Sequence, residues 1–223
     1  MSLLEVGFGW LLGFGSSFIF RWYDRSHKIN EFRKGLDTEL QEILPLLAGN
    51  VFSLKDSLGE LDHDLLKWYK SVISDYPQDT IMDIQKKLLD LFLSLSSEQL
   101  LAIMNVRESL KPDGSGKGLK KYNMNFYENN INLVSLFSAD CQSLVFKIHN
   151  KLQLINQEID RYLFYFDKTF DPNSVDINQD ILRDNMKQCL RTITTIAFDA
   201  VNAIIKLRSM LQTKSHGFLY NLR

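Results

Sequence analysis

Side chains that could perform chemistry are few in this chain, and their spacing does not form a metal-binding or catalytic motif. The four histidines are scattered, at His27, His63, His149 and His216. Spacings such as HxxxH, HExxH and CxxC, which bring ligands together around a metal ion, are absent from the sequence. Neither cysteine has a histidine at helical spacing, and no serine lies in a nucleophile elbow. We therefore expect no enzyme, no bound metal and no cofactor.

The segment 111–121, KPDGSGKGLKK, is the clearest loop in the sequence. Three glycines, one proline and four lysines predict an exposed, mobile and basic segment. Its GSGKG element lacks the GxxxxGK[ST] spacing of a phosphate-binding loop, because Lys117 is followed by glycine and no strand precedes it. We expect a solvated linker. The alternative is contact with phospholipid or RNA phosphate through its lysines, Lys111, Lys117, Lys120 and Lys121.

The longest apolar run covers residues 1–20, MSLLEVGFGWLLGFGSSFIF. It contains one charge, Glu5, and as a helix residues 3–20 would extend about 27 Å, close to the roughly 30 Å of a hydrocarbon core. A cleaved signal peptide is disfavoured because the start is acidic and no small-residue cleavage site follows. A buried core helix is the alternative. The run predicts a transmembrane anchor over residues 1–20.

Small residues recur at every fourth position of this run. Gly9, Gly13 and Ser17 form a small-xxx-small ridge, which lets helix backbones approach closely in lipid. Glu5 lies on the same stripe, and a carboxylate within a span is costly unless it faces a neighbour or water. The stripe predicts an anchor that self-associates, with Glu5 lining a pore. The alternative places Glu5 at the outer headgroups of a simple span.

Aromatic and basic residues follow the run directly. This order is typical of the cytoplasmic interface, because positive charge stays on the inner side and aromatic rings collect at the headgroups. The expected location is the inner membrane, crossed once, with the body of the protein in the cytoplasm and the lipid bilayer as a partner. The predicted interface residues are Arg21, Trp22, Tyr23, Arg25 and Lys28.

The composition beyond the run is that of a helical domain. The 26 basic and 27 acidic residues of the chain nearly cancel, which leaves at most a local contact with RNA. Four prolines and eleven glycines are few, and sparse helix breakers favour long helices. Apolar residues three or four apart predict a juxtamembrane helix over 21–48 and short helices over 49–110.

Apolar residues at the same spacing continue through 122–223, on both sides of a turn predicted at residues 171–174. They predict a long antiparallel helical hairpin. The fold class is therefore expected to be all-α, with a transmembrane helix followed by a cytoplasmic bundle. Cys141 and Cys189 fall on the apolar stripes of opposite arms at different heights, so both are expected to be buried and reduced.

One pair of residues indicates a possible link to RNA. Arg21 and His27, with five residues between them, match the Arg-x(4–6)-His signature of HEPN-superfamily ribonucleases, which the long antiparallel helices also resemble. The resemblance implies RNA binding or RNA cleavage. The pair follows the predicted anchor directly, whereas the family's motif belongs on a late helix of the bundle. This position favours a bundle without catalytic activity.

The predicted anchor, helical body and HEPN-like pair together resemble membrane-anchored accessory proteins of type VI-B CRISPR antiviral systems. This resemblance implies an RNA-guided nuclease as functional partner and a ring of subunits that forms a membrane pore. The expected function is thus an oligomeric pore or membrane-perturbing assembly in antiviral defence. The alternatives are a membrane-tethered HEPN-like RNA-binding protein or ribonuclease, and a non-catalytic membrane adaptor for a partner protein.

Overall fold

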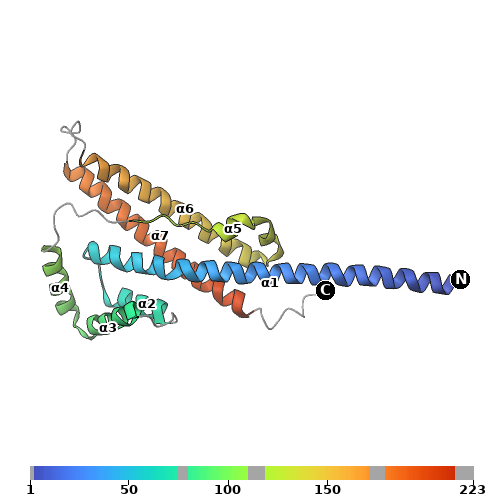
Figure 1. Cartoon of the computed structure of the whole chain (residues 1–223). Helices are drawn as coiled ribbons and strands as arrows, with labels where there is room; N and C mark the ends of the chain where they lie inside the picture. The colour runs from blue at the N-terminus through green and yellow to red at the C-terminus, as the bar shows by residue number, and fades with distance from the viewer. Residues whose placement is uncertain (1–2, 75–79, 110–118, 171–178, 214–223) are drawn as a thin grey trace.

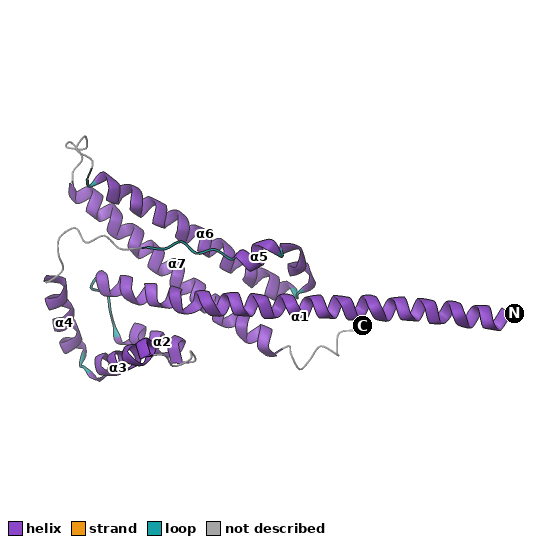
Figure 2. Cartoon of the chain, in the orientation of Figure 1, coloured by secondary structure: helices purple, strands orange, loops and turns teal. Residues whose placement is uncertain are grey.

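The computed structural model describes residues 3–74, 80–109, 119–170 and 179–213, with side chains of the first helix placed from residue 19 onward. The described residues contain no strand, which confirms the all-α part of the predicted fold class (Figure 2). In chain order the elements are α1 (Leu3–Ser57), α2 (His63–Ser74), α3 (Thr80–Ser94), α4 (Ser97–Ser109), α5 (Asn125–Asn129), the 3-10 helix η1 (Ile131–Leu136), α6 (Ala139–Lys168) and α7 (Gln179–Thr213).

Three long helices form the body of the molecule (Figure 1). α6 and α7 run antiparallel and pack along their length, as the hairpin prediction requires, and α7 also packs against α1. The predicted turn at 171–174 lies outside the described residues. Ion pairs hold the three helices in register, from Lys151 to Asp199 at 2.9 Å and from Arg208 to Asp37 at 2.7 Å.

The core between these helices is built from apolar residues at three- and four-residue spacing. Burial of each such leucine or isoleucine side chain contributes about 1.5–3 kcal/mol. Cys141 and Cys189 are both free and buried in this core, which confirms the expectation for the cysteines. The fully buried members include Phe32, Leu36, Leu40, Leu47, Val51, Ile148, Leu152, Ile155, Ala200, Val201, Ile204 and Leu207.

Helix α1 is longer than the sequence predicts. It continues through Pro45 to Ser57, whereas a helix end was expected near residue 48. A proline inside a helix is unfavourable by about 3 kcal/mol. Leu44, Leu47 and Ala48, on the turns around Pro45, are nearly or fully buried, so packing of these turns outweighs that penalty.

The first part of α1 also differs from the predicted transmembrane anchor. In the part of the chain that the structure describes, no helix is long and apolar enough to cross a membrane. This finding contradicts the transmembrane helix predicted over residues 1–20, the single-pass inner-membrane location derived from it and the expectation of a membrane pore. Two features of the chain account for the difference. The run leads into a 55-residue helix, and four glycines, three serines and Glu5 dilute its apolar residues.

The shorter elements pack around α1. α5 and η1 lie against it, and at Gly35 the Phe126 ring of α5 fills the space that a Cβ atom would need. The Glu39 carboxylate accepts hydrogen bonds from the backbone N–H groups of Phe126 at 2.7 Å and Tyr127 at 3.1 Å. α2 packs against α1 farther along, and α3 packs against α2. The carboxy-terminal half of α1 is therefore covered from several sides.

Candidate functional site

The amino-terminal half of α1 projects beyond the body (Figure 1). Packing against the body begins at Ile29, and no described side chain before it is buried. Four large side chains of this segment are exposed to solvent: Ile19 by 63%, Phe20 by 74%, Trp22 by 44% and Tyr23 by 65%. We call these four residues the aromatic face. Large apolar side chains gathered on an exposed surface are typical of an interaction site.

The aromatic face occupies one side of the projecting helix. At about 100° per residue, its four side chains fall within roughly 160° of the helix circumference. Charged residues occupy the opposite side, and the Lys28 ammonium donates a hydrogen bond to the Asp24 carboxylate at 2.7 Å. The charged residues are Arg21, Asp24, Arg25 and Lys28, all of them exposed. This segment is therefore amphipathic although the body does not cover its apolar side.

The aromatic face is not an extension of the stripe that packs against the body. Ile29, Phe32, Leu36 and Leu40 point toward the body, and their mean direction is rotated by about 115° from that of the aromatic face. If a helix of the body continued along α1 in the direction of this buried stripe, it would thus leave much of the aromatic face uncovered.

Arg21 and His27, the HEPN-like pair, are both exposed on this segment. Six residues along a helix correspond to about 9 Å of rise and place the two side chains about 120° apart around the axis. Arg21 lies on the charged side, and the His27 ring contacts the Tyr23 ring, with 6.5 Å between centroids. The helix therefore does not bring the guanidinium and the imidazole together at one point.

The remaining predicted site residues divide into those that the structure places and those that it does not. Glu5, Gly9, Gly13 and Ser17 lie on the α1 backbone, but their side chains are outside the described set, so their roles stay predictions. Lys111 and Lys117 of the basic loop also lie outside the described residues. Lys120 is exposed, whereas the Lys121 ammonium binds the Asp160 carboxylate of α6 at 2.7 Å. Lys121 thus attaches the loop end to the body.

Within the described residues, no group of three or more histidine, cysteine, aspartate or glutamate side chains could hold a metal ion. The chain matches no protein-family model, no curated protein and no solved structure. The surface of α1 is therefore the principal guide to function. The sequence carries a signal for it, since the direction of the apolar residues changes near residue 29, but Trp22 and Tyr23 beside basic residues also predict a membrane belt.

Proposed function

We propose that this protein is a non-enzymatic assembly protein whose copies associate through the projecting half of α1. The observation that carries the proposal is the exposure of the aromatic face on a helix that extends beyond its own body. The three-helix body then serves as the rigid part that the assembly arranges around the joined helices. An RNA-guided nuclease as partner and a role in antiviral defence stay predictions from the resemblance alone.

The size of the surface supports an interface that extends beyond the aromatic face. Large side chains present about 150–250 Å² each, so four that are 44% to 74% exposed offer on the order of 400 Å² per copy. Two copies would bury about 800 Å², less than the roughly 1,200 Å² of a stable interface. The uncharged residues 6–18, which precede the aromatic face on the same helix, supply the additional length.

A second copy of the chain is the occupant that this surface fits. The partner must be apolar over the same length of helix, and another α1 meets that requirement without a further protein. Most homo-oligomers are closed and symmetric, and a two-fold axis pairs a surface with itself. Gly9, Gly13 and Ser17 favour this arrangement, because small residues let two helices approach closely. The charged side of the segment can stay in solvent.

Cysteine cross-linking tests the proposal directly. Cys141 and Cys189 are buried, so an introduced cysteine on the surface is the reactive one. We expect Tyr23→Cys, on the aromatic face, to form a disulfide between copies under mild oxidation. Lys147→Cys, exposed on α6, is the matched control and should stay reduced. Equal cross-linking at both positions, or none at either, would overturn the proposal.

A further inference from the structure

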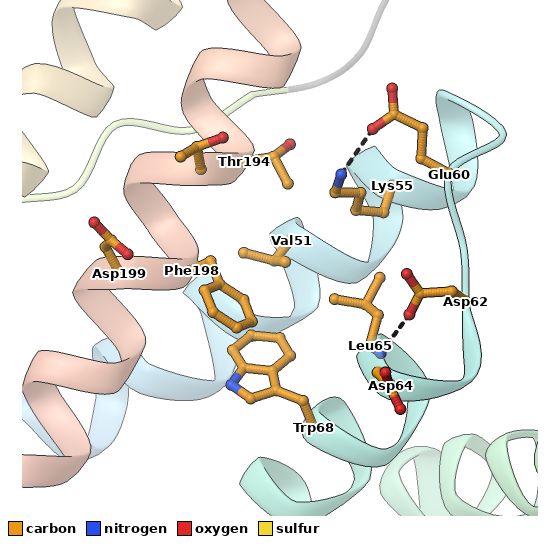
Figure 3. Close-up of a pocket in the computed structure, with 11 residues that line it drawn as sticks. Val51, Lys55, Glu60, Asp62, Asp64, Leu65, Trp68, Thr194, Phe198 and Asp199 are labelled. Atoms are coloured by element: carbon orange, nitrogen blue, oxygen red, sulfur yellow. Dashed lines mark hydrogen bonds and ion pairs between the residues drawn. The ribbon is translucent and has the colours of Figure 1, made fainter.

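A cavity of about 340 Å³ opens where the end of α1, the start of α2 and the middle of α7 meet (Figure 3). Its apolar lining consists of Val51, Leu65, Trp68 and Phe198. The Trp68 and Phe198 rings pack together with centroids 4.6 Å apart, and the Trp68 indole N–H donates to the Asn202 side-chain oxygen at 3.2 Å. Both rings are therefore held in place before any ligand arrives.

The charged lining of the cavity is predominantly acidic. It contains one ammonium group, that of Lys55, and this group already binds the Glu60 carboxylate at 2.7 Å. Arg191 binds the same carboxylate at 2.9 Å without lining the cavity. Among the residues that line the cavity, the charges of Lys55 and Glu60 cancel, and Arg191 adds one positive charge outside the lining. The charge that a ligand would meet comes from the three other carboxylates, Asp62, Asp64 and Asp199.

These three carboxylates stand on two sides of the apolar lining (Figure 3). Asp62 and Asp64 lie at the start of α2, where Asp62 accepts the Leu65 backbone N–H at 2.7 Å. Asp199 lies across the cavity on α7. Their cationic partners, Lys67 at 3.6 Å from Asp64 and Lys151 at 2.9 Å from Asp199, do not line the cavity.

We propose that this cavity binds an alkylammonium group, either a free diamine or the side chain of a lysine on a partner protein. The methylene chain would lie over Val51, Leu65 and the two rings, as the stems of lysine side chains commonly cover apolar surface. Ammonium groups would be attracted to the carboxylates and to the aromatic rings. The volume is near the lower end of the 300–1,000 Å³ range typical of ligand pockets, which suits a short linear chain.

Calorimetric titration of the full chain with cadaverine, n-pentylamine and 1-pentanol tests the proposal, because these probes share a five-carbon chain and differ in charge. We expect cadaverine to bind at least about 10-fold more tightly than 1-pentanol, with n-pentylamine between them, and added salt to reduce the difference. Equal binding of cadaverine and 1-pentanol, or no binding of cadaverine and of a lysine peptide, would overturn the proposal.

Two variants locate the binding and one serves as control. Asp199→Asn and Asp64→Asn each remove one negative charge from opposite sides of the cavity and should weaken cadaverine binding by about 3- to 10-fold. Asp90→Asn removes a carboxylate on α3 that is outside the cavity lining and 57% exposed, close to the 56% of Asp199, and should leave binding unchanged. An equal loss in all three variants would indicate attraction to the overall charge and would contradict a site at the cavity.

The source of the alkylammonium group is resolved with tripeptides. Gly-Lys-Gly presents a lysine side chain, and Gly-norleucine-Gly presents a similar chain without the charge. Stronger binding of Gly-Lys-Gly than of cadaverine would identify a partner protein as the source, and the reverse would identify a free diamine. Binding of the norleucine peptide as tight as that of the lysine peptide would contradict recognition of the ammonium group.

Discussion

The two halves of α1 are built from similar residues but have different surroundings. From Ile29 to Leu54, apolar side chains at three- and four-residue spacing are buried against α7, α2, α5 and η1. Among residues 19–28 no described side chain is buried, although the segment includes an isoleucine and three aromatic residues. The difference therefore lies in what covers each half, and hydrophobicity alone does not distinguish the two.

The two halves of α1 also differ in what keeps them helical. A helix of 55 residues is roughly 80 Å long, and the body covers only about half of that length. Helices in water derive most of their stability from packing, and helical segments without tertiary contacts are marginal. We therefore expect the projecting half to gain order when a partner covers it, whereas the packed half is ordered by contacts with its own chain.

The largest expected difference is between two truncations. Leu40→Ala in the packed half removes a side chain that is 0% exposed and should lower the free energy of unfolding by about 2–5 kcal/mol. Phe20→Ala in the projecting half should change it by less than about 0.5 kcal/mol in the monomer. Urea unfolding at low protein concentration measures both. Similar losses for the two variants would contradict the distinction between the halves.

A second substitution tests the contact of α1 with α5. Gly35→Ala places a methyl group where the Phe126 ring lies and should destabilise the fold by about 1–3 kcal/mol. In the double variant Gly35→Ala/Phe126→Ala the clash is absent, so the combined loss should be smaller than the sum of the single losses. Thermal unfolding of the wild type, the two single variants and the double variant provides this double-mutant cycle. Strictly additive losses would show that Gly35 and Phe126 do not contact each other.

Two ion pairs, one in each half of α1, should show a smaller difference in their contributions to stability. Asp37 and Arg208 join α1 to α7, with side chains 27% and 19% exposed, and Asp37→Ala should lower the free energy of unfolding by about 1 kcal/mol. Asp24 and Lys28 form a pair within the projecting half, with side chains 63% and 58% exposed. Asp24→Ala should therefore cost no more than about 0.5 kcal/mol. Chemical denaturation distinguishes the two, and a larger effect at Asp24 would contradict the assignment.

The smallest effect concerns pH. Burial raises the pKa of the Glu39 carboxyl above its usual value of 4.5, despite the hydrogen bonds from Phe126 and Tyr127 that act in the other direction. The folded chain then holds this proton more tightly than the unfolded chain. The stability from this group is present below pH 4.5 and is lost as the pH rises through the folded pKa.

The variant Glu39→Gln, which does not titrate, serves as the reference for this effect. The stability of the wild type relative to Glu39→Gln should decline as the pH rises above 4.5. Denaturation of both proteins across this range measures the difference. A difference that stays constant or increases with pH would show that burial does not control the carboxyl.

Periodicity predicted the hairpin of α6 and α7 because long amphipathic stripes have few alternative structures. It also placed Cys141 and Cys189 in the core. The end of α1 was not predictable, since the burial of Leu44 and Leu47 that outweighs Pro45 depends on contacts with distant residues. The exposure of Phe20 and Trp22 was missed for a related reason, because an apolar run does not reveal what covers it. The cavity depends on the meeting of three helices and leaves no local pattern.

The central claim is that the projecting half of α1 joins copies of the chain, and sedimentation of the full chain tests it most directly. The account predicts a mass that is a multiple of 25.9 kDa for the wild type and a mass near 25.9 kDa for Phe20→Glu, which places a charge on the aromatic face. Arg25→Glu, on the charged side of the same helix, should have the same mass as the wild type. A wild-type mass of 25.9 kDa at every concentration would contradict the account.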